Sequence, residues 1–411
     1  MMLSVKETES IILNLVQPIK DTEIVDLDTV SDRILATPVT SKLNFPYWDN
    51  SAMDGYAVKF ADVQSCNQEN PAILEVVEEI PAGYQPQKEI QPGQAARIFT
   101  GAMLPKGSDT IVIQENSQRE GNLVKIFSPP QTPGEFVRKQ GSFYLHGNPL
   151  LMPGIALNAA DIAVLATAQC TQITVFRRPR VAIFSTGDEL ITPEQTLQPG
   201  QIVDSNQYAL AAFVAQNGGI PIKMGIIPDD KEALKSTISQ AINSADLVLS
   251  TGGVSVGDYD YVEEILAELG GEIHVKSVAI KPGKPLTVAN FNNFHNSCLY
   301  FGIPGNPVSA LVSCWRFVQS ALKKMSGFLG NCLPDFVEGI TLTELRSGGK
   351  LETYFWGNVT LKDGKYEFSK AAGGQNSGNL INLAQTNSLA VLPVGKTVIE
   401  PGEKVMLRKL Y

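Results

Sequence analysis

Histidine and cysteine are scarce, and their scarcity excludes several kinds of site. The three histidines, His146, His274 and His295, lie far apart in the 411 residues, so a histidine-rich zinc or copper site is not expected. The five cysteines form no CxxC pair, which argues against a disulfide framework or a zinc ribbon. We expect buried thiols in a reducing compartment. A hard cation held by carboxylates is easier to build from this composition.

Long apolar runs and basic stretches are also missing. No segment approaches the ~20 apolar residues of a membrane span, and the first residues lack the pattern of a secretory signal. We therefore expect a cytoplasmic protein without membrane contact. The net charge of −9 and the lack of a basic stripe argue against nucleic-acid binding. A chain that is 43% hydrophobic and 411 residues long is expected to form two to four domains.

The first part of the chain changes its apolar spacing twice. Helical spacing predicts an amphipathic helix that ends before Pro18 and a second helix over 157–170, which we expect to pack together. Between them, short β-prone runs separated by Pro and Gly over 72–127 predict a small β domain. The predicted bounds are 1–45 with 135–178 for a discontinuous helical domain and 46–134 for the β domain inserted in it.

From Arg180 onward, strands and helices alternate regularly. This alternation predicts a parallel sheet covered by helices on both faces, over 179–328. After Cys332 the period changes to short strands with turns between them, which predicts a β barrel or sandwich over 329–411. Ligands of open α/β sheets bind outside the carboxyl ends of the strands, so the site is expected there.

The strongest motif is STGGVSVGDYD, residues 250–260, between a buried strand and a helix. Its glycines let the backbone approach a phosphate, and the helix N-terminus offers free N–H groups. The residues expected to form this cradle are Gly252, Gly253, Ser255 and Gly257. Asp258 and Asp260 would repel a phosphate unless a divalent cation lies between them. The alternative is that Asp260 only caps the helix, but the glycine pair beside two carboxylates favours a phosphate and metal site.

Two further acidic loops follow neighbouring strands. In STGDEL, residues 185–190, Thr186 and Gly187 can turn the chain while Glu189 reaches a metal; an ordinary turn with a solvated glutamate is the alternative. Asp229 follows another strand and, taken alone, is better explained as a helix cap. Three acidic loops at one edge of one sheet favour a shared cation.

Two more loops suit an anion. KPGKP places Lys281 and Lys284 three residues apart on a loop stiffened by prolines, although an exposed turn with solvated lysines is the alternative. In GIPGNPVSA, residues 302–310, Ser309 lies in the first turn of a helix, where anions bind well. The residues expected to make this second loop rigid are Pro304, Asn306 and Pro307.

One motif lies outside the α/β region. FPYWDNSAMDGYA, residues 45–57, places Asp54 near Tyr47, Trp48 and Tyr56, which suits a ligand that carries a ring. Aromatic residues pack in cores more often than they line cofactor sites, so the motif alone does not decide. RIFTGA, which contains Thr100, has the same standing.

Taken together, DNSAMDGYA, TGA, STGDEL, STGGVSVGDYDY, KPGKP and GIPGNPVSA resemble the MoeA family, which includes the E domain of gephyrin. The six motifs fall in the family's order over almost the whole chain. The resemblance implies a central MoaB/MogA-like parallel α/β domain, a discontinuous helical domain with an inserted β domain, and a C-terminal β barrel. It also implies a homodimer in which DNSAMDGYA of one subunit faces the α/β site of the other.

The resemblance further implies an activity: transfer of molybdenum from molybdate into adenylated molybdopterin, with Mg²⁺-dependent release of AMP. Catalytic roles would fall on Asp54, Glu189, Asp229 and Asp260, with Glu189 and Asp260 as Mg²⁺ ligands and Thr100 among the substrate-binding residues. Molybdate would be held by Lys281, Lys284, Ser309, Lys350 and Ser377.

The chain departs from the family's pattern at three places. Phe143 stands where the family usually has an acidic residue. Lys350 and Trp356 stand where the C-terminal domain often carries arginines that help to bind molybdate. A lysine cannot offer the planar, bidentate fork of a guanidinium.

Other functions stay open at this point: molybdopterin adenylyltransfer from ATP, a non-enzymatic scaffold of the gephyrin kind, or a tungsten-selective relative. The short adenylyltransferases also carry TGG with a downstream acid, but they lack DNSAMDGYA. Expected partners are a molybdopterin adenylyltransferase and chaperones of molybdoenzymes.

Overall fold

The structure is a computed structural model that describes residues 2–252, 261–292 and 297–410. The chain folds as two compact units. The larger unit comprises Met1–Ala36, Pro153–Asn158 and Ile173–Tyr411, and the smaller unit comprises Thr37–Met152 and Ala159–Gln172. The predicted helical domain, 1–45 with 135–178, is therefore shared between the two units. No helix in the described ranges is long and apolar enough to cross a bilayer.

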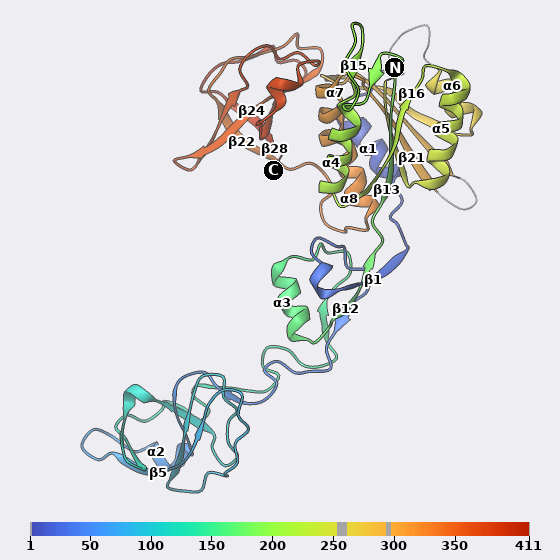
Figure 1. Cartoon of the computed structure of the whole chain (residues 1–411). Coiled ribbons are helices and arrows are strands. Elements are labelled where there is room, and N and C mark those ends of the chain that lie inside the picture. Colours follow the sequence, from blue (N-terminus) through green and yellow to red (C-terminus); the bar gives the residue numbers. More distant parts are fainter. Residues whose placement is uncertain (1, 253–260, 293–296, 411) are drawn as a thin grey trace. The chain divides into compact units, whose positions relative to one another are not determined.

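A six-stranded sheet forms the centre of the larger unit (Figure 1). In spatial order its strands are β16 (Ile220–Ile227), β13 (Arg180–Thr186), β17 (Leu247–Thr251), β21 (Ser297–Ile303), β20 (Pro285–Asn292) and β18 (Glu272–Ser277). The first four pair in parallel, as predicted, but β20 is antiparallel to both neighbours. The prediction of a wholly parallel sheet is wrong at β20 because only residues 278–284 connect it to β18. A parallel pair needs a crossover of about a dozen residues.

Helices cover both faces of this sheet, because successive side chains of each buried strand point to opposite faces. Two helices pack on one face: α5 (Lys231–Ser244) and α6 (Val262–Glu268). The other face carries α4 (Asn206–Gln216), α7 (Pro307–Ser313) and α8 (Gln319–Met325), as Figure 1 shows. A π-helical turn, Cys314–Val318, joins α7 to α8. The strand ends that carry the predicted loops are thus held by two packed cores.

The N-terminal helix α1 (Val5–Leu15) also belongs to this core. Ser4 caps it in a capping box, and its buried Val5 and Ile12 pack with the strands and α8. The expected partner helix is α3 (Ala159–Thr167), which lies in the smaller unit. The prediction that these two helices pack together is therefore wrong, because α1 buries its apolar stripe on the α/β core.

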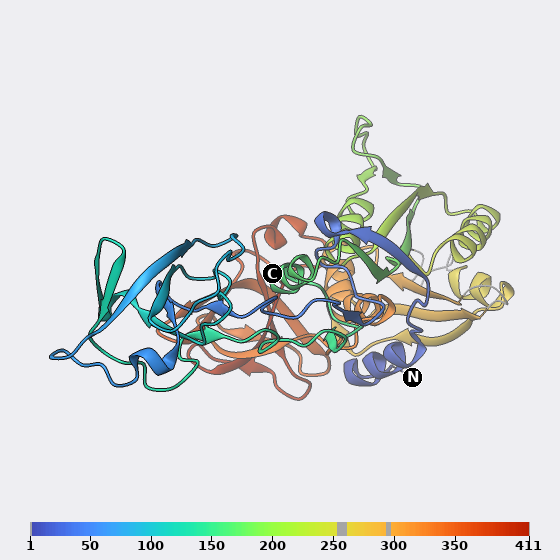
Figure 2. The same ribbon diagram turned by 90° about the horizontal axis from the view of Figure 1, so that it is seen from below.

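The C-terminal region is a closed barrel of five strands, the red part of Figures 1 and 2. Around the barrel they are β24 (Glu352–Lys362), β25 (Lys365–Lys370), β22 (Phe336–Thr341), β28 (Lys404–Lys409) and β26 (Ser388–Leu392), and β26 pairs back with β24. The predicted barrel is confirmed. A short strand of the KPGKP segment, β19 (Ile280–Lys281), pairs in parallel with β24 and so ties the lysine loop to the barrel.

The smaller unit is built on the predicted β domain, a six-stranded sheet. Its order is β7 (Thr110–Ile113), β4 (Gly55–Val58), β6 (Gln94–Ile98), β5 (Ala72–Ile80), β9 (Leu123–Ile126) and β8 (Ser117–Glu120). Gly55 of DNSAMDGYA lies in β4, where an added Cβ would stand 2.0 Å from the Val112 carbonyl oxygen. Only glycine fits there, because β4 packs closely against β7 at this position. The motif thus places Asp54 directly before an interior strand of the sheet.

Candidate functional site

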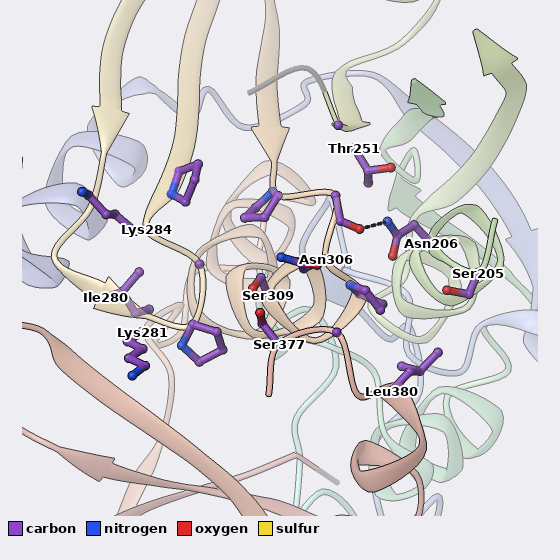
Figure 3. A pocket seen from close by; sticks show the side chains of 18 of the residues that line it. Ser205, Asn206, Thr251, Ile280, Lys281, Lys284, Asn306, Ser309, Ser377 and Leu380 are labelled. Atoms are coloured by element: carbon purple, nitrogen blue, oxygen red, sulfur yellow. Dashed lines mark hydrogen bonds between the residues drawn. The ribbon is translucent and has the colours of Figure 1, made fainter. Parts of the chain in front are cut away.

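A cavity of about 980 Å³ lies at the carboxyl ends of β13, β17 and β21, with the barrel as its opposite wall. Figure 3 shows part of its lining. The predicted site residues in this lining are Thr186, Glu189, Gly252, Lys281, Lys284, Pro304, Asn306, Pro307, Ser309 and Ser377. Residues far apart in the sequence therefore share one cavity, at the sheet edge where the strand rule places a ligand.

The strand-end loops are locked together by one buried carboxylate that the sequence analysis did not single out. Asp204 is 3% exposed and accepts hydrogen bonds from the Ser185 hydroxyl at 3.1 Å, the Asn206 amide at 3.0 Å and the Gln207 side chain at 2.6 Å. Thr251 in turn donates to Ser185 at 2.9 Å. Asp204 thus joins the ends of β13 and β17 to the start of α4.

Asn206 extends this network across the cavity floor. Its side-chain amide donates to the Gly305 carbonyl oxygen at 2.8 Å, which is the dashed line in Figure 3. The sequence does carry a signal for this network: Asp204 begins a run of four polar residues, Asp204–Gln207, at the start of the largely apolar helix α4.

The glycine at the start of the STGG loop is fixed by its neighbours. Gly252 has a φ of +88°, and an added Cβ would lie 2.6 Å from the Thr186 hydroxyl and 2.7 Å from its carbonyl oxygen. The backbone of one loop therefore crosses directly over the end of the adjacent strand. Gly252 also lines the cavity, so the first residue of the predicted phosphate cradle faces it. The remaining predicted residues of this loop, Gly253, Ser255, Gly257, Asp258 and Asp260, lie outside the described residues.

Acidic side chains gather beside the cavity. Burial, together with the charges of Asp188 and Glu189, raises the pKa of Asp229, although a hydrogen bond from the Asp188 backbone opposes this shift. In return, the Asp229 backbone amide donates to Asp188 Oδ1 at 3.2 Å. Glu189 lies on the cavity wall and its carboxylate sits over Gly187. The helix cap of α5 is Asp230, which accepts from the Ala233 amide at 2.8 Å, so capping does not account for Asp229. Within the described ranges, no three acidic, His or Cys side chains converge as a ready metal site.

The opposite side of the cavity is basic. Lys281 and Lys284 line this side, and Gly283 between them has a φ of +106°. An added Cβ on Gly283 would lie 2.9 Å from the Ser313 hydroxyl, so the loop packs closely on α7. Ser309 in α7 is 4% exposed, and the Val308 amide donates to the Ser377 carbonyl oxygen at 3.2 Å. Ser309 and Ser377 therefore lie beside one another (Figure 3), one from the α/β domain and one from a barrel loop.

Three family models match the chain. They are described as the MoeA N-terminal region (domain I and II), at residues 3–168, a probable molybdopterin binding domain, at 182–324, and the MoeA C-terminal region (domain IV), at 338–410. A protein of Nostoc sp. named molybdopterin molybdenumtransferase is 58% identical over 412 residues, which cover 100% of this chain and 94% of the relative. The chain belongs to the MoeA family. The family and fold class predicted from the motifs are thereby confirmed.

More distant relatives support the same membership. A molybdopterin molybdenumtransferase of Haemophilus influenzae is 31% identical, with 99% of this chain and 98% of the relative covered. The crystal structure of a molybdopterin biosynthesis MoeA protein from Pyrococcus horikoshii is 28% identical and superposes with a TM-score of 0.84 over 100% of both chains.

Two of the predicted residues of this MoeA chain lie in the smaller unit. Asp54 accepts hydrogen bonds from both the amide and the hydroxyl of Thr100, each at 2.7 Å, and these bonds lower the pKa of Asp54. Arg97 stacks over Tyr56 and Phe99 beside this pair. The structure therefore brings Asp54 and Thr100 together as a hydrogen-bonded pair in which the Asp54 carboxylate is ionised.

The barrel wall differs from what the family pattern suggested. Lys350 is not among the residues that line the cavity, whereas Arg346, which the sequence analysis passed over, is. Trp356 is 1% exposed in the same wall, and its backbone is bonded to the Gln375 side chain. Phe143, in place of the family acid, is 73% exposed in the smaller unit.

Proposed function

We propose that the chain is a molybdopterin molybdenumtransferase, which transfers molybdenum from molybdate to adenylated molybdopterin and releases AMP. One observation carries the proposal: Gly252 at the start of the glycine loop, Glu189 and the paired Lys281 and Lys284 line a single cavity. The names of the relatives and the matched molybdopterin binding domain support the pterin substrate.

The cavity divides by charge into two subsites. Gly252 and Thr186, beside the rigid Pro304–Pro307 loop, suit the phosphates of the adenylated pterin because the backbone there can approach closely. Lys281 and Lys284, with Ser309 and Ser377, suit a second oxyanion, which is molybdate. Phosphoryl transfer needs mainly positioning and compensation of charge, and this set supplies both.

The acidic wall fits a hard cation. Carboxylate oxygens are the preferred ligands of Mg²⁺. Glu189 lines the cavity, and burial with the nearby charges of Asp188 and Glu189 raises the pKa of Asp229, which supports an acidic environment there. In the proposal, Glu189 and Asp260 hold Mg²⁺, which when bound neutralises charge on the pyrophosphate. Asp229 adds a second carboxylate near Glu189, which increases the negative charge that would attract the cation. Water adds to the AMP phosphorus, the bond to the pterin phosphate breaks, and AMP leaves.

The smaller unit enters the proposal through a homodimer. Asp54 keeps an ionised carboxylate that is hydrogen-bonded to Thr100, as a residue that receives a charged ligand needs. In the homodimer that we propose, Asp54 of the partner subunit completes the site. A molybdopterin adenylyltransferase that supplies the substrate and chaperones that receive the product are the proposed partners.

The test is to incubate the purified chain with adenylated molybdopterin, molybdate and Mg²⁺. We expect AMP release that requires both ions and a product that activates an apo-molybdoenzyme. Release of pyrophosphate from ATP and free molybdopterin would instead indicate adenylyltransfer. Failure to release AMP and to form active cofactor would reject the proposal.

A further inference from the structure

Arg346 is the positively charged residue of the barrel that lines the cavity, among the residues that the structure describes. Among the described lining residues, three carry a positive side chain: Lys281, Lys284 and Arg346. Of these three, only Arg346 has a guanidinium. A guanidinium can bind two oxygens of one anion in a plane, which an ammonium group cannot do.

The barrel fixes the backbone that carries Arg346. The short strand β23 (Leu345–Arg346) pairs antiparallel with β27 (Val398–Ile399), and the next amide, Ser347, donates to Thr397 at 2.8 Å. Leu345 is fully buried in the barrel core. Because adjacent residues of a strand point to opposite sides, burying Leu345 turns Arg346 outward to the cavity.

One edge of the guanidinium is already engaged. The Arg346 Nε donates to Glu344 Oε1 at 3.0 Å and its Nη2 donates to Glu344 Oε2 at 2.8 Å. An exposed pair of this kind adds little stability, but it sets the direction of the group. A guanidinium has five N–H donors, so the edge formed by Nη1 and the second Nη2 hydrogen is left for a bidentate contact with an oxyanion.

We infer that Arg346, not Lys350, supplies the oxyanion-binding fork of this cavity, from its barrel side. The inference rests on the proposed function and deepens it. The ligand chemistry is a tetrahedral dianion, which is either molybdate or a phosphate of the nucleotide. Glu344 acts as a positioning residue that presents the free edge.

The experiment measures binding separately from turnover. Isothermal titration calorimetry with sodium molybdate and, in a second series, with AMP would compare the wild type with Arg346→Gln, Arg346→Lys and Lys350→Gln. Lys362→Gln, at the tip of the β24–β25 hairpin, is the control for loss of one positive charge. Circular dichroism and thermal melting check that each variant keeps its fold.

We expect Arg346→Gln to lower the affinity for one of the two anions about tenfold, because a charge-assisted bidentate contact is lost. Arg346→Lys should restore only part of the affinity, since it keeps the charge without the fork. Loss for molybdate assigns the fork to the metal oxyanion, and loss for AMP assigns it to the nucleotide. Lys350→Gln and Lys362→Gln should change neither affinity by more than about twofold.

Unchanged affinity of Arg346→Gln for both anions would overturn the inference, as would a tenfold loss confined to Lys350→Gln. Failure of the wild type to bind either anion would instead count against the proposed function itself. The two failures are therefore distinguishable in one series of titrations.

Discussion

Replacing Asp204 by alanine tests whether the loops of the cavity depend on one buried carboxylate. The change leaves donors from Ser185, Asn206 and Gln207 without their acceptor in a place with almost no solvent. A buried polar group left unsatisfied costs about 1–3 kcal/mol, and these donors share one neighbourhood, so their costs do not add fully. We expect the free energy of unfolding of the larger unit to fall by about 3 kcal/mol.

Tryptophan fluorescence can follow the larger unit alone. The three tryptophans are Trp48, which lies in the smaller unit, and Trp315 and Trp356, which are buried in the larger one. In a Trp48→Phe background, urea unfolding therefore reports the core that contains Asp204. The exposed Glu232→Ala is the control and should change stability by less than about 0.5 kcal/mol.

The same variant has a functional consequence. Asn206 and Thr251 line the cavity and are held through Asp204 and Ser185, so molybdate affinity should fall even under conditions where the protein stays folded. If Asp204→Ala unfolds at the same urea concentration as the Trp48→Phe parent and binds molybdate equally well, the network does not hold the site and the reasoning is wrong.

Three further outcomes are expected. Lys284→Gln should raise the KM for molybdate about tenfold and change kcat less, while equal kinetics would remove Lys284 from the oxyanion subsite. Asp188→Asn should lower the raised pKa of Asp229 in part, since burial stays, so the acidic limb of the kcat/KM profile should move to lower pH; a fixed or higher limb would contradict this. Glu9→Ala removes the ion-pair partner of the buried Arg316, which among the described residues then keeps only its hydrogen bond to the Tyr354 hydroxyl, and should destabilise the larger unit by about 3–5 kcal/mol in the same urea assay; an effect below about 1 kcal/mol would contradict this.

Local patterns predicted most elements of the fold because Pro and Gly turns mark their ends clearly. The sequence analysis assigned no element to the residues directly after KPGKP, so it missed β20 and its antiparallel pairing with β21. The partner of α1 was predicted wrongly because an apolar stripe shows that a helix is buried, not against what it packs.

The site shows the same division. Glu189, Gly252 and the lysine pair stand at strand ends, so their neighbourhood follows from the rule for α/β sheets. Asp204 and Arg346 could not be found this way. The first acts through hydrogen bonds between segments, and the second reaches the cavity only because the barrel packs on the α/β domain.

A crystal structure of the chain soaked with sodium molybdate and AMP, with anomalous scattering recorded at the molybdenum edge, tests the central claim most directly. The account predicts a molybdenum peak in the cavity between the Lys281–Lys284 loop and Ser309, with the AMP phosphate at Gly252. A molybdenum peak elsewhere, with this cavity empty of both ligands, would contradict it.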